Sequence, residues 1–138
     1  MKEYNISDDK SRLDLKLIHQ IISNSYWAKG RSFEEVKRSI DNSICYGIYI
    51  ADKQVGFARV LTDFVTIAYL MDVFIIEEYR GQGLSKKLLK RVLNDQQFNS
   101  VKKWVLATKD AHSLYKKFGF HEMKNSGKYM EKLKVRIN

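Results

Sequence analysis

Apolar residues in the first part of the chain recur at the spacing of amphipathic helices. One helix is predicted over about residues 12–24, and a second begins after Ser32. The run Ser32-Phe-Glu-Glu35 has the form of a capping box, in which the two end residues satisfy each other's backbone N–H groups. The apolar faces of these helices are Leu15, Ile18, Ile21 and Ile22, and then Phe33, Val36 and Ile40.

Strands are predicted where β-branched and aromatic residues gather in short runs between turn residues. Two of these runs lie so close together that they indicate a hairpin, with its turn at Asp52-Lys53. The runs that predict strands cover residues 3–8, 44–51, 54–61, about 65–76 and 101–108.

The segment from Asp72 to Leu89 is the most informative part of the chain. A hydrophobic strand stops, a charged turn leads into Arg80-Gly-Gln-Gly83, and a helical pattern then continues to about residue 97. Glycines let the backbone turn sharply and approach a ligand closely. The first turn of a helix has unpaired N–H groups and a partial positive charge. The segment therefore predicts a site for a phosphate or pyrophosphate.

The end of the chain predicts one more helix and two closing strands. Asp110 is expected to cap the helix, Gly119 to end it, and the strands to cover 120–123 and 128–136. The resulting order, β-α-α-β-β-β-α-β-α-β-β, predicts an α+β fold. We expect a mixed, mostly antiparallel central sheet of about six to seven strands, flanked on both faces by about four helices. The apolar face of the last helix is Ala111, Leu114, Tyr115 and Phe118.

Composition narrows the class of protein. A length of 138 residues suits a single domain over 1–138 with one core. The net charge of +9 favours an acidic partner, but the basic residues are spread along the chain, which argues against nucleic acid. No apolar run long enough for a membrane span and no leader segment appear. The single cysteine, Cys45, is interpreted as a small core or strand residue. One cysteine cannot form an internal disulfide, which fits a reducing cytoplasm.

Two motifs and the order of elements resemble the GNAT superfamily of acetyl-coenzyme A-dependent N-acyltransferases, over essentially the whole chain. The motifs are Arg80-Gly-Gln-Gly83-Leu-Ser85 and Leu114-Tyr115-Lys-Lys-Phe-Gly-Phe120. The loop signature of the superfamily is Arg/Gln-x-x-Gly-x-Gly/Ala, so Ser85 departs from it at the third position, although serine is small enough to admit phosphate oxygens. Finer sequence features look like a group of small, stand-alone bacterial members.

The resemblance implies acetyl-coenzyme A as the cosubstrate. The backbone of the strand before the loop would pair with the pantetheine arm as if with another strand, and the loop amides would hold the pyrophosphate. Arg80 is expected either to contact the phosphates or to brace the loop. The donor-binding residues so implied are Val73, Phe74, Ile75, Arg80, Gly81, Gln82, Gly83, Leu84, Ser85 and Lys86.

Tyr115 is the best catalytic candidate, since it occupies the position of the tyrosine of the superfamily. Direct attack of a primary amine on the thioester goes through a tetrahedral intermediate and expels a thiolate. A phenol with a pKa near its ordinary value of about 10 can act as general acid toward that thiolate. The alternative is that Tyr115 only packs, because it lies on the apolar face of its helix.

The general base is less defined. Asp72 is a candidate beside the cofactor strand, but simple alternation places it on the face opposite Val73. A buried ion pair of Arg59 with Asp72 or Asp63 is the structural alternative, and a bulge in the strand would reverse the side of Asp72. Deprotonation through water needs no named residue.

The acceptor side carries few signals. Tyr26 and Trp27 fall in the loop between the first two helices, where they either line the acceptor pocket or cap the core. The substrate-binding candidates are Tyr26, Trp27, Arg59 and Asp72. No cluster of residues has metal-ligand spacing, so no metal is expected. We expect a small-molecule amine as acceptor, with no nucleic acid or membrane partner, and a homodimer is open because dimers are common among relatives.

Three other functions compete with this hypothesis. The chain could acetylate a protein lysine or N-terminus, which would require an open groove. It could be a non-catalytic acyl-coenzyme A-binding regulatory module, although Tyr115 argues mildly against that. A small nucleic-acid binder would leave the glycine loop unexplained.

Overall fold

The computed structural model describes residues 3–134, and this part of the chain falls into two compact units. The first unit ends at Ala107, and the second begins at Thr108. No helix of the described residues is long and apolar enough to cross a membrane.

The first unit is built on a five-stranded sheet whose strands follow one another in sequence order. Its strands are β1 (Asn5–Ser7), β2 (Ile44–Ile50), β3 (Lys53–Thr62), β4 (Ala68–Ile75) and β5 (Trp104–Val105). The first four pair antiparallel, and β5 pairs with β4 in parallel. The prediction of a mixed, mostly antiparallel sheet is confirmed, with fewer strands than the six to seven expected.

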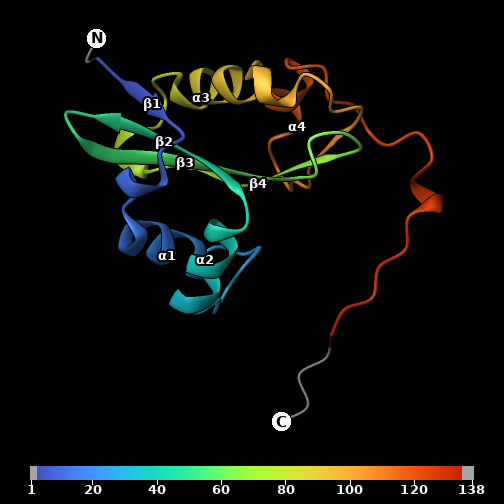
Figure 1. The fold of residues 1–138 in the computed structure, drawn as a ribbon, viewed down its shortest axis with the longest axis horizontal. Helices are drawn as coiled ribbons and strands as arrows, with labels where there is room; N and C mark the ends of the chain where they lie inside the picture. Colours follow the sequence, from blue (N-terminus) through green and yellow to red (C-terminus); the bar gives the residue numbers. More distant parts are fainter. Residues whose placement is uncertain (1–2, 135–138) are drawn as a thin grey trace. The chain divides into compact units, whose positions relative to one another are not determined.

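Helices cover both faces of this sheet (Figure 1). Helices α1 (Leu15–Ser23) and α2 (Phe33–Asp41) lie on one face, and α3 (Leu84–Leu93) lies on the other. The Ser32 hydroxyl accepts from the backbone N–H of Glu35, and the Glu35 carboxylate accepts from the backbone N–H of Ser32. The predicted capping box of α2 is therefore confirmed. Helix α3 is shorter than predicted, because a separate 3-10 turn follows it at Gln96–Phe98.

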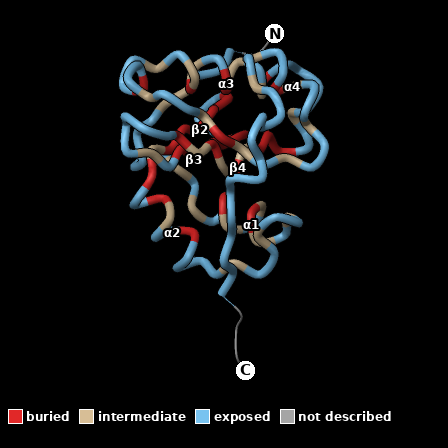
Figure 2. The backbone as a smooth tube through the Cα atoms, turned by 90° about the vertical axis from the view of Figure 1, so that its right-hand side faces the viewer, coloured by how far each residue is buried: buried red, intermediate tan, exposed pale blue. Residues whose placement is uncertain are grey.

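The core of the first unit lies between the sheet and these helices, as Figure 2 shows by the buried central strands. Cys45 is buried on β2, where its thiol donates to the carbonyl of Ile40 at 3.7 Å. Burial raises the pKa of this thiol to about 12. The interpretation of Cys45 as a core residue is therefore confirmed.

The hairpin between β2 and β3 turns one residue earlier than predicted. The turn residues are Ala51 and Asp52, with φ angles of 49° and 66°. Two left-handed residues in a two-residue loop give the twist that a hairpin needs. The expected turn at Asp52-Lys53 is wrong because Lys53 already pairs with Ile50.

In the second unit, α4 (His112–Lys116) begins differently from the prediction. Its N-cap is Ala111, whose N–H donates to the Thr108 hydroxyl at 3.1 Å, so Asp110 is not the cap. No described side chain makes a capping hydrogen bond at this N-cap position. Gly119 has a φ of 91°, the left-handed conformation expected of a glycine that ends a helix.

The predicted closing strands are absent from the described residues. Residues 120–134 contain no strand, only a 3-10 turn at Ser126–Lys128, and positions 135–136 lie outside the described residues. The strand predicted over 101–108 is reduced to β5. Alternation of polar and apolar residues indicates which side chains share a face, but a strand also requires a hydrogen-bonded partner, which this pattern does not specify.

Candidate active site

The predicted glycine loop stands between β4 and α3. Gly81 and Gly83 have φ angles of 79° and 75°, a conformation that other residues rarely adopt. A Cβ atom built at either position meets no protein atom within 4 Å. The glycines are therefore needed for the path of the backbone, and the space beside them is open to a ligand.

Helix α3 begins at this loop without a side-chain cap. Gly83 is the N-cap residue, and the first backbone bond of the helix runs from Lys87 N–H to the Gly83 carbonyl. Among the described residues, no protein acceptor meets the N–H groups of Leu84, Ser85 and Lys86. Three N–H donors at the positive end of a helix dipole suit a pyrophosphate, so the residues fit the donor that the motifs imply.

Arg80 ties the loop to the strand before it. Its Nε donates to the backbone carbonyl of Ile75 at 2.9 Å, which is the bracing role considered for this side chain. Of the nearby lysines, Lys87 places its ammonium over the ring of Tyr4, at 4.6 Å from the centroid. Lys86 is exposed in the first turn of α3, next to the unpaired amides.

One edge of β4 is open over its second half. Strand β5 pairs with β4 only at Ala68 and Tyr69. On its other edge β4 pairs with β3, where the Ile76 N–H donates to the Val55 carbonyl. The neighbouring pair, Ile75 and Gly56, is therefore one whose two residues make no hydrogen bonds to each other. In such a pair the N–H and C=O groups point away from the partner strand. The N–H and the carbonyl of Ile75 therefore both point to the open edge. The carbonyl accepts a hydrogen bond from Arg80 Nε.

A β-bulge interrupts β4 just before this open edge. The register with β3 moves from Phe57–Phe74 to Arg59–Met71, so that one residue of β4 is extra. The extra residue is Asp72, which has a φ of 55°. A left-handed conformation is uncommon for a residue other than glycine, although aspartate tolerates it better than most. The bulge overrides simple alternation and turns the Asp72 side chain toward Arg59.

Three donors converge on the Asp72 carboxylate, which is 1% exposed. Trp27 Nε1 donates to Oδ1 at 2.8 Å, and Arg59 Nε donates to Oδ2 at 2.8 Å. Arg31 Nη1 is also within reach of Oδ2, at 3.3 Å. We call these four residues the Asp72 cluster. The predicted ion pair of Arg59 is confirmed with Asp72, whereas the carboxylate of Asp63 accepts N–H groups of its own loop.

The cluster brings together three of the four predicted acceptor-site residues and adds one. Tyr26 and Trp27 stand edge to face, with ring centroids 5.4 Å apart, and are 60% and 43% exposed. Trp27 contacts the cluster through its indole N–H. The loop therefore supplies both an exposed aromatic surface and a buried hydrogen bond. Arg31 was not predicted, because a single arginine before a capping box gives no signal in the sequence.

Tyr115 lies in the second unit. It is buried, and its ring packs edge to face on Phe120 at a centroid distance of 5.8 Å. His112 is exposed and its Nε2 lies 3.1 Å from the Thr108 carbonyl, a contact with the start of its own helix. No group of three or more His, Cys, Asp or Glu side chains among the described residues has the arrangement of a metal site.

Comparison with known families supports the resemblance that the two sequence motifs indicate. The family model of the acetyltransferase (GNAT) domain matches residues 41–122, from the end of α2 to the segment after α4. A candidate acetyltransferase of Gibberella zeae is 28% identical, over 83% of this chain and 77% of that protein. An uncharacterised N-acetyltransferase of Prochlorococcus marinus is 33% identical, over 68% of this chain and 54% of that protein.

Solved structures agree in fold. A candidate GNAT-family acetyltransferase of Xanthomonas campestris is 40% identical, with a TM-score of 0.93 over 96% of this chain and 94% of that chain. A candidate acetyltransferase of Clostridium acetobutylicum, crystallised with acetyl-coenzyme A, is 18% identical with a TM-score of 0.65 over 99% of this chain and 96% of that chain. At this identity the second match concerns the fold alone.

Proposed function

The chain belongs to the GNAT acetyltransferase family, and on that premise we propose that it moves an acetyl group from acetyl-coenzyme A to the primary amine of a small molecule. The observation that carries the proposal is the uncapped start of α3. Its free N–H groups follow two left-handed glycines with open space beside them. These features favour a pyrophosphate at the loop.

The donor would extend from the loop along the open edge of β4. The backbone N–H of Ile75 is available there. Phe74 pairs with Phe57 of β3, so the next residue with its backbone groups at the open edge is Val73. A pantetheine arm that adds to this edge would satisfy those groups as a sixth strand would. Arg80 would hold loop and strand in a fixed relation, so that the two parts of the donor are bound together.

In the proposed reaction, the neutral amine attacks the thioester carbonyl and forms the C–N bond of a tetrahedral intermediate, which then collapses with breakage of the C–S bond. Tyr115 would donate its phenolic proton to the departing sulfur, a role that rests on its place in the family motif. A backbone N–H at the open edge of β4 would meet the developing negative charge on oxygen.

The proton lost by the amine would pass to water. Asp72 is a poor candidate for this step because its carboxylate is buried and already accepts from three donors. We assign it instead to positioning Trp27 and Arg31 at the acceptor side.

Binding of the donor can be tested with a matched pair of glycine variants. Gly83→Leu would fill the open space at the loop, whereas Gly30→Leu introduces a side chain at a similar φ of 82° in the α1–α2 loop, also in open space. Calorimetry should show acetyl-coenzyme A binding to the native protein and to G30L, and at least tenfold weaker binding to G83L. Equal affinity for all three proteins would place the pyrophosphate elsewhere.

A further inference from the structure

The charges of the Asp72 cluster do not balance. One carboxylate faces two guanidinium groups, those of Arg59 and Arg31. Arg59 is the nearer and more buried partner, since its Nε lies 2.8 Å from Oδ2 and its side chain is 6% exposed. Its two other nitrogens donate to the Ser43 hydroxyl and the Met71 sulfur. Arg59 therefore neutralises Asp72 and has all three nitrogens engaged within the protein.

Arg31 is the surplus cation. Its one contact with the carboxylate is the longer of the two, at 3.3 Å from Nη1, and its side chain is 24% exposed. Among the described residues, no protein acceptor meets its Nε or Nη2. A guanidinium that is anchored through one nitrogen keeps a fork of donors for a planar anion. Its direction is fixed by the anchoring carboxylate, which is itself held by the bulge in β4.

We propose that the acceptor carries a carboxylate beside its amine, and that Arg31 binds this carboxylate. The proposal rests on the acetyl transfer proposed above and specifies its acceptor as an amine of the amino-acid type. A carboxylate fits better than a phosphoryl group because a planar fork matches two coplanar oxygens. The second anion of the system, the pyrophosphate of the donor, already has a site at the start of α3.

The position of Arg31 suits recognition of the acceptor rather than of the donor. Its anchor, Asp72, directly precedes Val73, at the start of the open edge proposed to carry the thioester end of pantetheine. Trp27 donates to the same carboxylate, and its exposed ring stands edge to face with that of Tyr26, so the two rings form an apolar surface next to the Asp72 cluster. The acceptor would therefore be held at its carboxylate by Arg31 and at its apolar part by the two rings.

The test compares pairs of acceptors that differ in one group. Free L-amino acids and the corresponding L-amino acid amides have the same amine, but only the acids carry the carboxylate. Transfer is measured as release of the coenzyme A thiol from acetyl-coenzyme A. We expect at least one acid to be a better acceptor than its amide, by on the order of 10- to 100-fold in kcat/KM, the range for a lost charged hydrogen bond.

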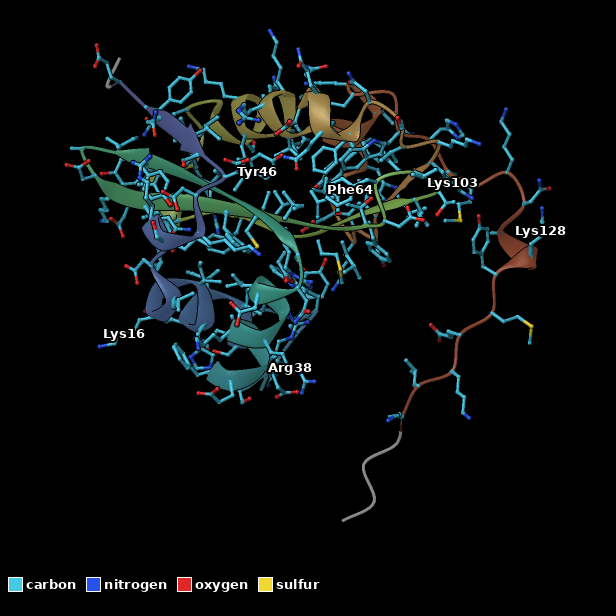
Figure 3. All side chains as sticks on the ribbon, in the orientation of Figure 1. Lys16, Arg38, Tyr46, Phe64, Lys103 and Lys128 are labelled. Carbon is cyan, nitrogen blue, oxygen red and sulfur yellow. The ribbon has the colours of Figure 1, made fainter. Side chains whose placement is uncertain are left out.

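Variants of Arg31 connect this preference to the side chain. Arg31→Gln should raise KM for the preferred acid by a similar factor, leave kcat within about twofold, and leave the amide unchanged. Arg31→Lys keeps the charge without the fork and should lie between the two. The matched control is Arg38→Gln, which removes the same charge from a residue that is exposed on the outer side of α2 (Figure 3). Melting temperatures establish that each variant is folded.

Three results would overturn the inference while leaving acetyl transfer in place. The first is equal kcat/KM for amides and acids, and the second is an unchanged KM for the preferred acid in R31Q. The third is a rise in this KM in R38Q that equals the rise in R31Q. If no amine is acetylated, the proposed function fails, and binding then decides the role of Arg31. Calorimetry with N-acetyl-L-amino acids and their amides should show binding of the acids to the native protein and none to R31Q. Equal binding to both proteins would contradict the site.

Discussion

The Nε atom of Arg80 donates to the carbonyl oxygen of Ile75 at 2.9 Å and so joins the glycine loop to the end of β4. The two halves of the proposed donor site thereby share one fixed geometry. Pre-organisation of this kind lowers the cost of ordering a binding site.

Arg80→Lys should therefore weaken binding of acetyl-coenzyme A by several-fold, even though the charge is retained. Lysine lacks the planar group that directs Nε at the carbonyl. Lys90→Gln, which removes a charge from an exposed position on α3, serves as control. Calorimetric affinities decide between two roles: full affinity in R80K would show that Arg80 acts through its charge alone.

The Asp72 cluster should matter for stability as well as for the acceptor. Asp72→Asn keeps the size of the side chain and its tolerance of the left-handed backbone, but leaves Arg59 buried without its counter-ion. Breaking a buried ion pair by removing one partner costs about 3–5 kcal/mol. Urea unfolding should show a loss of this order for D72N and less than about 0.5 kcal/mol for Glu34→Gln on the exposed face of α2. Similar stabilities of the two variants would mean that the cluster relaxes without cost.

Cys45 should be unreactive in the folded protein. Burial raises the pKa of its thiol to about 12, so that at pH 8 only about one molecule in ten thousand carries the thiolate that alkylating reagents attack. Mass spectrometry after incubation with iodoacetamide should find no adduct under native conditions and complete reaction in guanidinium chloride. Rapid native alkylation would show that the strand opens readily.

Tyr115→Phe tests the general acid. It removes only the phenolic oxygen, so kcat should fall by about 100-fold or more while the affinity for acetyl-coenzyme A stays the same. Tyr129→Phe, at a half-exposed tyrosine of the second unit, is the matched control. Unchanged turnover in Y115F would leave Tyr115 with the packing role that its contact with Phe120 already indicates.

The features that the sequence predicted well are local. The capping box at Ser32 and the left-handed glycines of the loop depend on neighbours within a few residues, and the structure contains both. The hydrophobic run of β4 predicted a strand, but not that β3 would force Asp72 into a bulge, because a bulge is a property of two paired strands. The role of Arg31 was hidden for the same reason, since it depends on where that bulge points the carboxylate.

The errors follow the same division. Helix α4 begins after Ala111 and not after Asp110, and the Ala111 N–H donates to the Thr108 hydroxyl, a local contact that the sequence pattern does not reveal. Closing strands were predicted over 120–123 and 128–136, but no described residue of 120–134 has the pairing that a strand requires.

Acetyl transfer to an amine is tested most directly by release of free thiol from acetyl-coenzyme A in the presence of an amine panel that includes the amino acids and their amides. We expect thiol release that depends on enzyme and amine, and mass spectrometry should identify the acetylated amine as the product. Bound acetyl-coenzyme A without release for any amine would contradict acetyl transfer to a small-molecule amine, and the chain would then be a protein acetyltransferase or an acyl-coenzyme A-binding module.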